Sequence, residues 1–89
     1  MIEKSILITN STGLHARPAA QFVQAAAKFE SKIKVSKAGR EVDAKSIISV
    51  LSLGVSKGTE ITLKAEGEDE QAAVEALIGL IQRGFGEVG

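Results

Sequence analysis

Residues 32–43 have the sequence KIKVSKAGREVD, and this stretch decides the class of fold. Ile33 and Val35 alternate with lysine and serine, which predicts a strand with one apolar and one polar face. Ala38 and Gly39 can turn the chain, so the four residues after them are predicted to form a partner strand and complete a hairpin. Strands that are polar on one face are typical of a sheet that is covered on one side only.

Outside the hairpin, two further runs alternate between apolar and polar residues. One covers residues 2–8, where Ile2, Ile6 and Ile8 share a phase, and the other covers residues 60–66. The chain therefore supplies four strands. Because each has a single apolar phase, we expect an antiparallel sheet rather than a parallel sheet covered on both faces.

Three segments have the spacing of amphipathic helices. The first covers residues 16–28, the second is a short apolar segment at residues 47–53, and the third begins at the acidic run 68–70. Negative charge suits the start of the third helix because it complements the helix dipole. The order βαββαβα, without a linker or repeat, predicts an α+β fold for residues 1–89 as a single domain. Three helices on one side of a four-stranded antiparallel sheet make a two-layer sandwich.

The composition excludes several classes of function. The 89 residues include no cysteine and one histidine, so neither a disulfide framework nor a cluster of thiolate or histidine metal ligands is possible. Eleven basic and eleven acidic residues cancel, which argues against a nucleic-acid binder. No stretch has the length of a membrane span, and the N-terminus lacks the layout of a signal peptide. We therefore expect a cytoplasmic monomer with no metal, cofactor, nucleic-acid partner or membrane partner.

The single histidine, His15, lies where a phosphoryl group could be held. We expect it at the start of the first helix, as the N-cap or its immediate neighbour. Unpaired N–H groups and the positive end of the helix dipole suit an anion at this position. Arg17 adds a fork of donors, and Pro18 has no N–H, so the backbone donors left for a phosphate are mainly those of Ala16 and Arg17. An ordinary surface residue or a modest helix cap is the alternative interpretation of His15.

The sequence GLHARPA at residues 13–19 resembles the active-site signature of the HPr family. These proteins are the histidine-containing phosphocarriers of the bacterial phosphoenolpyruvate-dependent phosphotransferase system. The resemblance covers essentially the whole chain, including AKSI at residues 44–47 and AEG at residues 65–67. It implies an open-faced sandwich with the order βαββαβα, in agreement with the pattern of strands and helices.

The resemblance also implies a function. His15 would accept a phosphoryl group from phosphorylated enzyme I and donate it to the IIA component of an enzyme II complex in sugar transport, with Arg17 close to the phosphate. Such a protein is a carrier, acting as substrate and donor for other phosphotransferases, and has no turnover of its own. A phosphatase or mutase that works through phosphohistidine is the alternative class. Such enzymes usually need a second histidine or a general acid beside the nucleophile.

Ser46 has two interpretations. The resemblance implies a regulatory serine that a dedicated kinase phosphorylates, whereas serine is also a preferred N-cap for the short helix that follows it. Ile47, Ile48 and Leu51 in that helix are candidates for docking to partner proteins, with ordinary core packing as the alternative.

Two features of the sequence leave the pathway open. Ile48, Ser49 and Leu51 stand where that form has Met, Gly and Met, which leaves binding to a catabolite-control transcription factor undecided. GFGE at residues 84–87 resembles the nitrogen-related branch of the family. The alternatives to the sugar system are therefore a nitrogen-related phosphorelay and a regulatory binding module that acts through Ser46.

Overall fold

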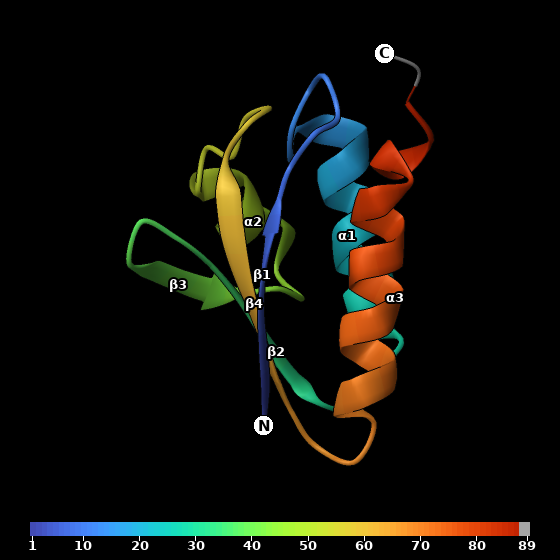
Figure 1. Ribbon diagram of the computed structural model, residues 1–89. Helices are drawn as coiled ribbons and strands as arrows, with labels where there is room; N and C mark the ends of the chain where they lie inside the picture. Colours follow the sequence, from blue (N-terminus) through green and yellow to red (C-terminus); the bar gives the residue numbers. More distant parts are fainter. Residues whose placement is uncertain (88–89) are drawn as a thin grey trace.

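The computed structural model describes residues 1–87, and its strands and helices form two layers (Figure 1). The strands are β1 (Ile2–Leu7), β2 (Lys32–Lys37), β3 (Arg40–Asp43) and β4 (Glu60–Glu66). The helices are α1 (Ala16–Ala27), α2 (Ile47–Ser52) and α3 (Glu70–Gln82), followed by a short 3-10 turn, η1 (Gly84–Gly86). The predicted order βαββαβα and the α+β class are confirmed.

The four strands form one antiparallel sheet in the order β1-β4-β2-β3. β4 lies between β1 and β2, so the first and last strands of the chain are neighbours, with Ile2 opposite Ala65. The β2–β3 hairpin is present as predicted. Its two turn residues, Ala38 and Gly39, have φ values of 51° and 85°, as a two-residue hairpin turn requires.

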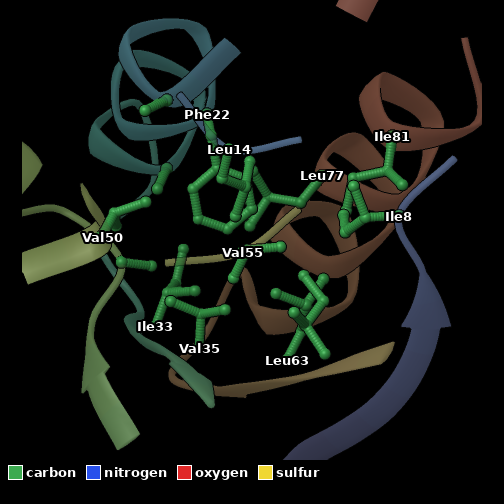
Figure 2. Packing of buried hydrophobic residues seen from close by; sticks show 14 of the residues in the cluster. Ile8, Leu14, Phe22, Ile33, Val35, Val50, Val55, Leu63, Leu77 and Ile81 are labelled. Carbon is green, nitrogen blue, oxygen red and sulfur yellow. The ribbon is translucent and has the colours of Figure 1, made fainter. Parts of the chain in front are cut away.

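The core fills the space between the sheet and the helices (Figure 2). β2 and β4 turn their apolar residues inward, as the alternation predicts. α1 and α3 lie side by side against this face, and α2 packs against α1 and adds Val50 to the same core. Burying one large aliphatic or aromatic side chain contributes roughly 1.5–3 kcal/mol. The largest buried side chains include Phe22, Leu14, Ile33, Leu63, Leu77 and Ile81.

The opposite face of the sheet is exposed and polar. Lys64 and Glu41 form an ion pair there at 3.1 Å, which raises the pKa of Lys64, and the hydroxyl groups of Ser5 and Thr62 are 3.0 Å apart. The prediction of a sheet covered on one side is therefore confirmed. Within residues 1–87 no helix is long and apolar enough to cross a membrane.

The boundaries differ from the prediction by one residue in places. β1 ends at Leu7, and the buried Ile8 that follows donates its N–H to the carbonyl of Thr59 at 2.9 Å. α1 ends at Ala27, with Lys28 as its C-cap, and α2 ends at Ser52, with Leu53 as its C-cap. Differences of one residue are expected at the ends of helices and strands, where the regular hydrogen bonding stops at a cap.

The acidic start of α3 makes a tertiary contact that the dipole argument did not predict. Asp69 is the N-cap, yet its carboxylate makes no cap hydrogen bond to its own helix. It accepts the N–H groups of Glu30 and Ser31 at 2.8 and 2.9 Å, together with the Ser31 hydroxyl. These bonds, that of the Ser31 hydroxyl first, lower the pKa of Asp69. Asp69 therefore fastens the loop between α1 and β2 to the start of α3.

Candidate functional site

His15 is the N-cap of α1 and is exposed to solvent, as predicted. Its backbone is extended, with φ −113° and ψ 156°, and its carbonyl accepts the N–H of Ala19 at 3.3 Å. The side chain makes no cap hydrogen bond, and no residue in the range 1–87 forms a hydrogen bond or ion pair with it. The imidazole is therefore accessible to a protein that approaches this end of α1.

The N–H groups of Ala16 and Arg17 lie at the first turn of the helix. Neither donates a hydrogen bond to any atom of residues 1–87, and Pro18 has no N–H to add. Unpaired donors at a helix start are suited to phosphate oxygens. These two N–H groups are free of partners within residues 1–87, and their binding of a phosphate beside His15 stays a prediction.

Ala16 has a backbone conformation that the sequence did not reveal. Its φ is 38°, in the left-handed region that residues other than glycine, asparagine and aspartate seldom adopt. Such a conformation costs about 1–3 kcal/mol and persists only where the surrounding structure enforces it. The strain lies directly after His15.

Arg17 is exposed, and within the part of the chain that the structure describes it has no ion-pair partner. It lines a pocket of about 180 Å³ together with Pro18, Phe85, Gly86 and Glu87. The C-terminal segment is thus brought beside the start of α1, which the sequence pattern did not predict.

The loop that carries His15 is held against the segment that precedes β4. Leu14 is buried, and its N–H donates to the carbonyl of Val55 at 3.0 Å. Gly13 has a φ of 64°, and a Cβ atom at this position would lie 2.3 Å from the Val55 oxygen and 2.7 Å from Cα of Ser56. Only glycine allows this close approach, so Gly13 contributes to where His15 is placed.

Ser46 is the N-cap of α2, and its hydroxyl oxygen accepts the N–H of Ser49 at 3.3 Å. The interpretation of Ser46 as a helix cap is therefore confirmed. Its regulatory phosphorylation stays a prediction.

The three predicted docking residues lie on the outer side of α2. Ile48 is 78% exposed, while Ile47 and Leu51 are 37% and 39% exposed. Val50 is the residue of this helix that fills the core, so burial does not explain the three exposed aliphatic side chains. Their role in docking stays a prediction.

A small open-faced α+β sandwich that presents an exposed histidine and an arginine at the start of a helix has the arrangement of a histidine phosphocarrier domain. The family model described as "PTS HPr component phosphorylation site" matches residues 2–83. This chain belongs to the HPr family.

Relatives of this chain agree with that assignment over nearly the full length. The HPr-like protein Crh of Halalkalibacterium halodurans is 51% identical over 83 residues, which cover 93% of this chain and 99% of the relative. The phosphocarrier protein HPr of Cupriavidus necator is 46% identical over 87 residues, covering 98% of both chains. The crystal structure of HPr-C-His from Thermoanaerobacter tengcongensis has a TM-score of 0.98 at 55% identity and covers all of both chains.

The expectation of a monomer is not confirmed by these comparisons. A crystal structure described as an HPr dimer from Thermoanaerobacter tengcongensis has a TM-score of 0.80 at 56% identity, covering 98% of this chain and all of the other.

Proposed function

We propose that this chain is a phosphocarrier that accepts a phosphoryl group on His15 from phosphorylated enzyme I and donates it to a IIA component of the sugar phosphotransferase system. The observation that carries the proposal is the exposed His15 at the start of α1, next to the unpartnered N–H groups of Ala16 and Arg17. Membership in the HPr family supports it. We further propose that residues 1–89 act as a single cytoplasmic domain and a monomer, without turnover of their own.

The proposed transfer is a displacement at phosphorus. A lone pair on a ring nitrogen of His15 forms the new P–N bond while the bond from phosphorus to the donor breaks, and the second transfer reverses these roles. The helix dipole stabilises the bound dianion by roughly 0.3–1 kcal/mol, and up to about 2 in partly buried geometry. Charge-assisted hydrogen bonds add roughly 1.5–3 kcal/mol each when shielded, and less from the exposed side chain of Arg17. A total of a few kcal/mol holds the group without trapping it.

We place partner docking on the apolar patch of α2, formed by Ile47, Ile48 and Leu51. α2 packs against α1, and His15 is the N-cap of α1. A single partner protein could therefore contact the apolar patch and His15 together. Contact with exposed aliphatic side chains gains free energy by removing apolar surface from water.

The experiment that tests the function is incubation with phosphoenolpyruvate and enzyme I, followed by addition of a IIA protein. We expect one acid-labile phosphoryl group per chain, located on His15, which then appears on the IIA protein. Comparing a sugar-specific IIA protein with a nitrogen-related one identifies the branch. No uptake from enzyme I, together with hydrolysis of a test phosphomonoester, would favour the phosphatase alternative.

Arg17→Ala is expected to slow phosphoryl transfer and to leave the fold intact. The guanidinium is exposed and forms no ion pair within residues 1–87, so stability loses little, whereas the bound phosphate loses a bidentate donor. Transfer rates from enzyme I and to IIA, measured beside thermal unfolding, check this. Arg17→Lys serves as a control that keeps the charge but not the planar fork. Unchanged transfer rates in both variants would show that Arg17 does not contribute to phosphoryl transfer.

A regulatory role through Ser46 is the second candidate function. Its hydroxyl lies at the start of α2, next to the apolar patch. The similarity to the HPr-like protein Crh also favours it. A phosphoserine there would complement the α2 dipole, but it would place a dianion beside the surface where a partner must exclude water. We infer that phosphorylation of Ser46 by a serine kinase slows phosphoryl uptake on His15.

Two substitutions separate the cap from the regulatory role. Ser46→Ala should transfer phosphate normally and lose about 0.5–2 kcal/mol of stability, because the N–H of Ser49 loses its acceptor. Ser46→Asp should be at least as stable as the wild type and slower to receive phosphate from enzyme I. Initial rates and thermal unfolding of the three proteins give the answer. If Ser46→Asp accepts phosphate as fast as the wild type, Ser46 is a helix cap and the regulatory proposal fails.

A further inference from the structure

α3 ends at the same end of the molecule where α1 begins (Figure 1), and Phe85, Gly86 and Glu87 line one pocket with Arg17 and Pro18 of α1. Three consecutive residues have positive φ values, which are 62° at Gly84, 56° at Phe85 and 77° at Gly86. For a bulky side chain such as phenylalanine this conformation is rare and must be enforced. The ring of Phe85 is buried, with 4% of the residue exposed, and anchors the turn in the core. The turn that leads into Glu87 is therefore anchored by the packing of Phe85.

The carboxylate of Glu87 is received by the loop that precedes His15. Thr12 donates through its hydroxyl group at 2.7 Å and its N–H at 3.4 Å, the side-chain amide of Asn10 donates at 3.0 Å, and the hydroxyl of Ser11 donates at 3.4 Å. These donors, the Thr12 hydroxyl first and the Asn10 amide second, lower the pKa of Glu87. Three successive residues near the start of the sequence thus donate hydrogen bonds to one carboxylate near its end.

Asn10 relays this contact toward His15. Its amide nitrogen donates to Glu87 and also to the carbonyl of Gly13 at 2.9 Å, and the N–H of Gly13 returns to the carbonyl of Asn10 at 3.2 Å. Because both acceptors need N–H donors, the orientation of the amide is fixed. The side-chain oxygen of Asn10, Oδ1, is buried and has no hydrogen-bond partner within residues 1–87. The side-chain NH2 group of Asn10 thus makes both of its hydrogen bonds, while Oδ1 makes none. These two bonds connect Glu87 to Gly13.

We propose that Glu87 is a positioning residue for phosphoryl transfer, which restrains residues 10–14 and thereby sets the position of His15 at the start of α1. The inference rests on the phosphocarrier function proposed above. The contacts of the loop with Val55 fix its inner side, and the carboxylate of Glu87 fixes its outer side. Without Glu87, the donors of Asn10 and Thr12 turn to water, and His15 samples positions away from the phosphate donors.

The test is the rate of phosphorylation by enzyme I for the wild type, Glu87→Ala and Glu87→Gln. We expect Glu87→Ala to lower kcat roughly tenfold, because displacement by about 1 Å can cost up to 10²-fold, with little change in KM. Glu87→Gln should recover most of the rate, since its amide oxygen can still accept from Asn10 and Thr12. Glu68→Ala is the matched control. It removes one exposed negative charge before the start of α3, at the other end of that helix, and should transfer at the wild-type rate.

Thr12→Val gives a readout that a general loss of stability would not produce. If Thr12 and Glu87 act as one unit, the double variant Thr12→Val with Glu87→Ala is no slower than the slower single variant. Losses that multiply, a wild-type kcat in Glu87→Ala, or an equal loss in Glu68→Ala would each overturn the proposal.

Amide exchange separates failure of this inference from failure of the proposed function. If the wild type takes no phosphate from enzyme I, the phosphocarrier function fails, and the restraint is then judged by exchange alone. The N–H groups of Gly13 and Leu14 should exchange faster in Glu87→Ala than in Glu68→Ala. Equal exchange in the two variants would show that Glu87 does not restrain the loop.

Discussion

We expect His15→Ala to abolish acid-labile phosphate uptake from enzyme I and to leave the fold unchanged. His15 is the single histidine of the chain, so no second imidazole can replace it as acceptor. The side chain is exposed and makes no hydrogen bond to residues 1–87, so its removal creates no cavity and leaves no buried group without a partner. Surface substitutions of this kind change stability by about 0.5 kcal/mol or less.

The measurement is phosphate incorporation with phosphoenolpyruvate and enzyme I, followed by acid treatment. The phosphoramidate of His15 is lost in acid, whereas a phosphoserine survives. Thermal unfolding of the same samples controls for folding. Incorporation by His15→Ala at the wild-type level, or an acid-stable product in the wild type, would contradict the assignment of His15 and would direct attention to Ser46.

The fold was predictable where neighbouring residues determine it. The β2–β3 hairpin depends on the alternation at Ile33 and Val35 and on a two-residue turn, and both signals lie within twelve residues of sequence. The strand order was not predicted from the pattern of residues. The strand order depends on pairs such as Ile2 of β1 and Ala65 of β4, which lie far apart in the sequence. No local pattern specifies a partner at that separation.

The site divides in the same way. The placement of His15 and Arg17 at a helix start follows from a short local motif. The roles of Asp69 and Glu87 depend on acceptors reaching donors from Ser31 and Thr12, which lie far away in the sequence. Asp69, at a helix start, is equally consistent with a dipole contact and with a bond to a distant loop, and Glu87, after the last turn, has no local pattern that names its partner. Only the three-dimensional arrangement distinguishes these two roles.

Gly13→Ala is expected to destabilise the protein and to slow phosphoryl transfer strongly. Two costs combine at this position. An alanine at φ 64° costs about 1–2 kcal/mol, because the left-handed region brings Cβ close to the following carbonyl. In addition, its Cβ would lie 2.3 Å from the carbonyl oxygen of Val55, which is backbone and cannot rotate away. Overpacking of this kind adds about 1–3 kcal/mol unless the loop moves.

Gly39→Ala isolates the first cost from the second. Gly39 has a φ of 85°, also in the left-handed region, but a Cβ there meets no atom within 4 Å. Both variants should therefore be destabilised by the unfavourable backbone conformation of alanine. Only Gly13→Ala should also disrupt the contact between the loop and Val55. Relief of that clash moves residues 10–14 away from Val55 and carries His15 with them, so we expect enzyme I to phosphorylate Gly13→Ala much more slowly than Gly39→Ala at a temperature where both are folded. Denaturant unfolding and initial transfer rates measure the two effects separately. Equal stability and equal rates in the two variants would mean that the close approach of Gly13 to Val55 does not set the position of His15.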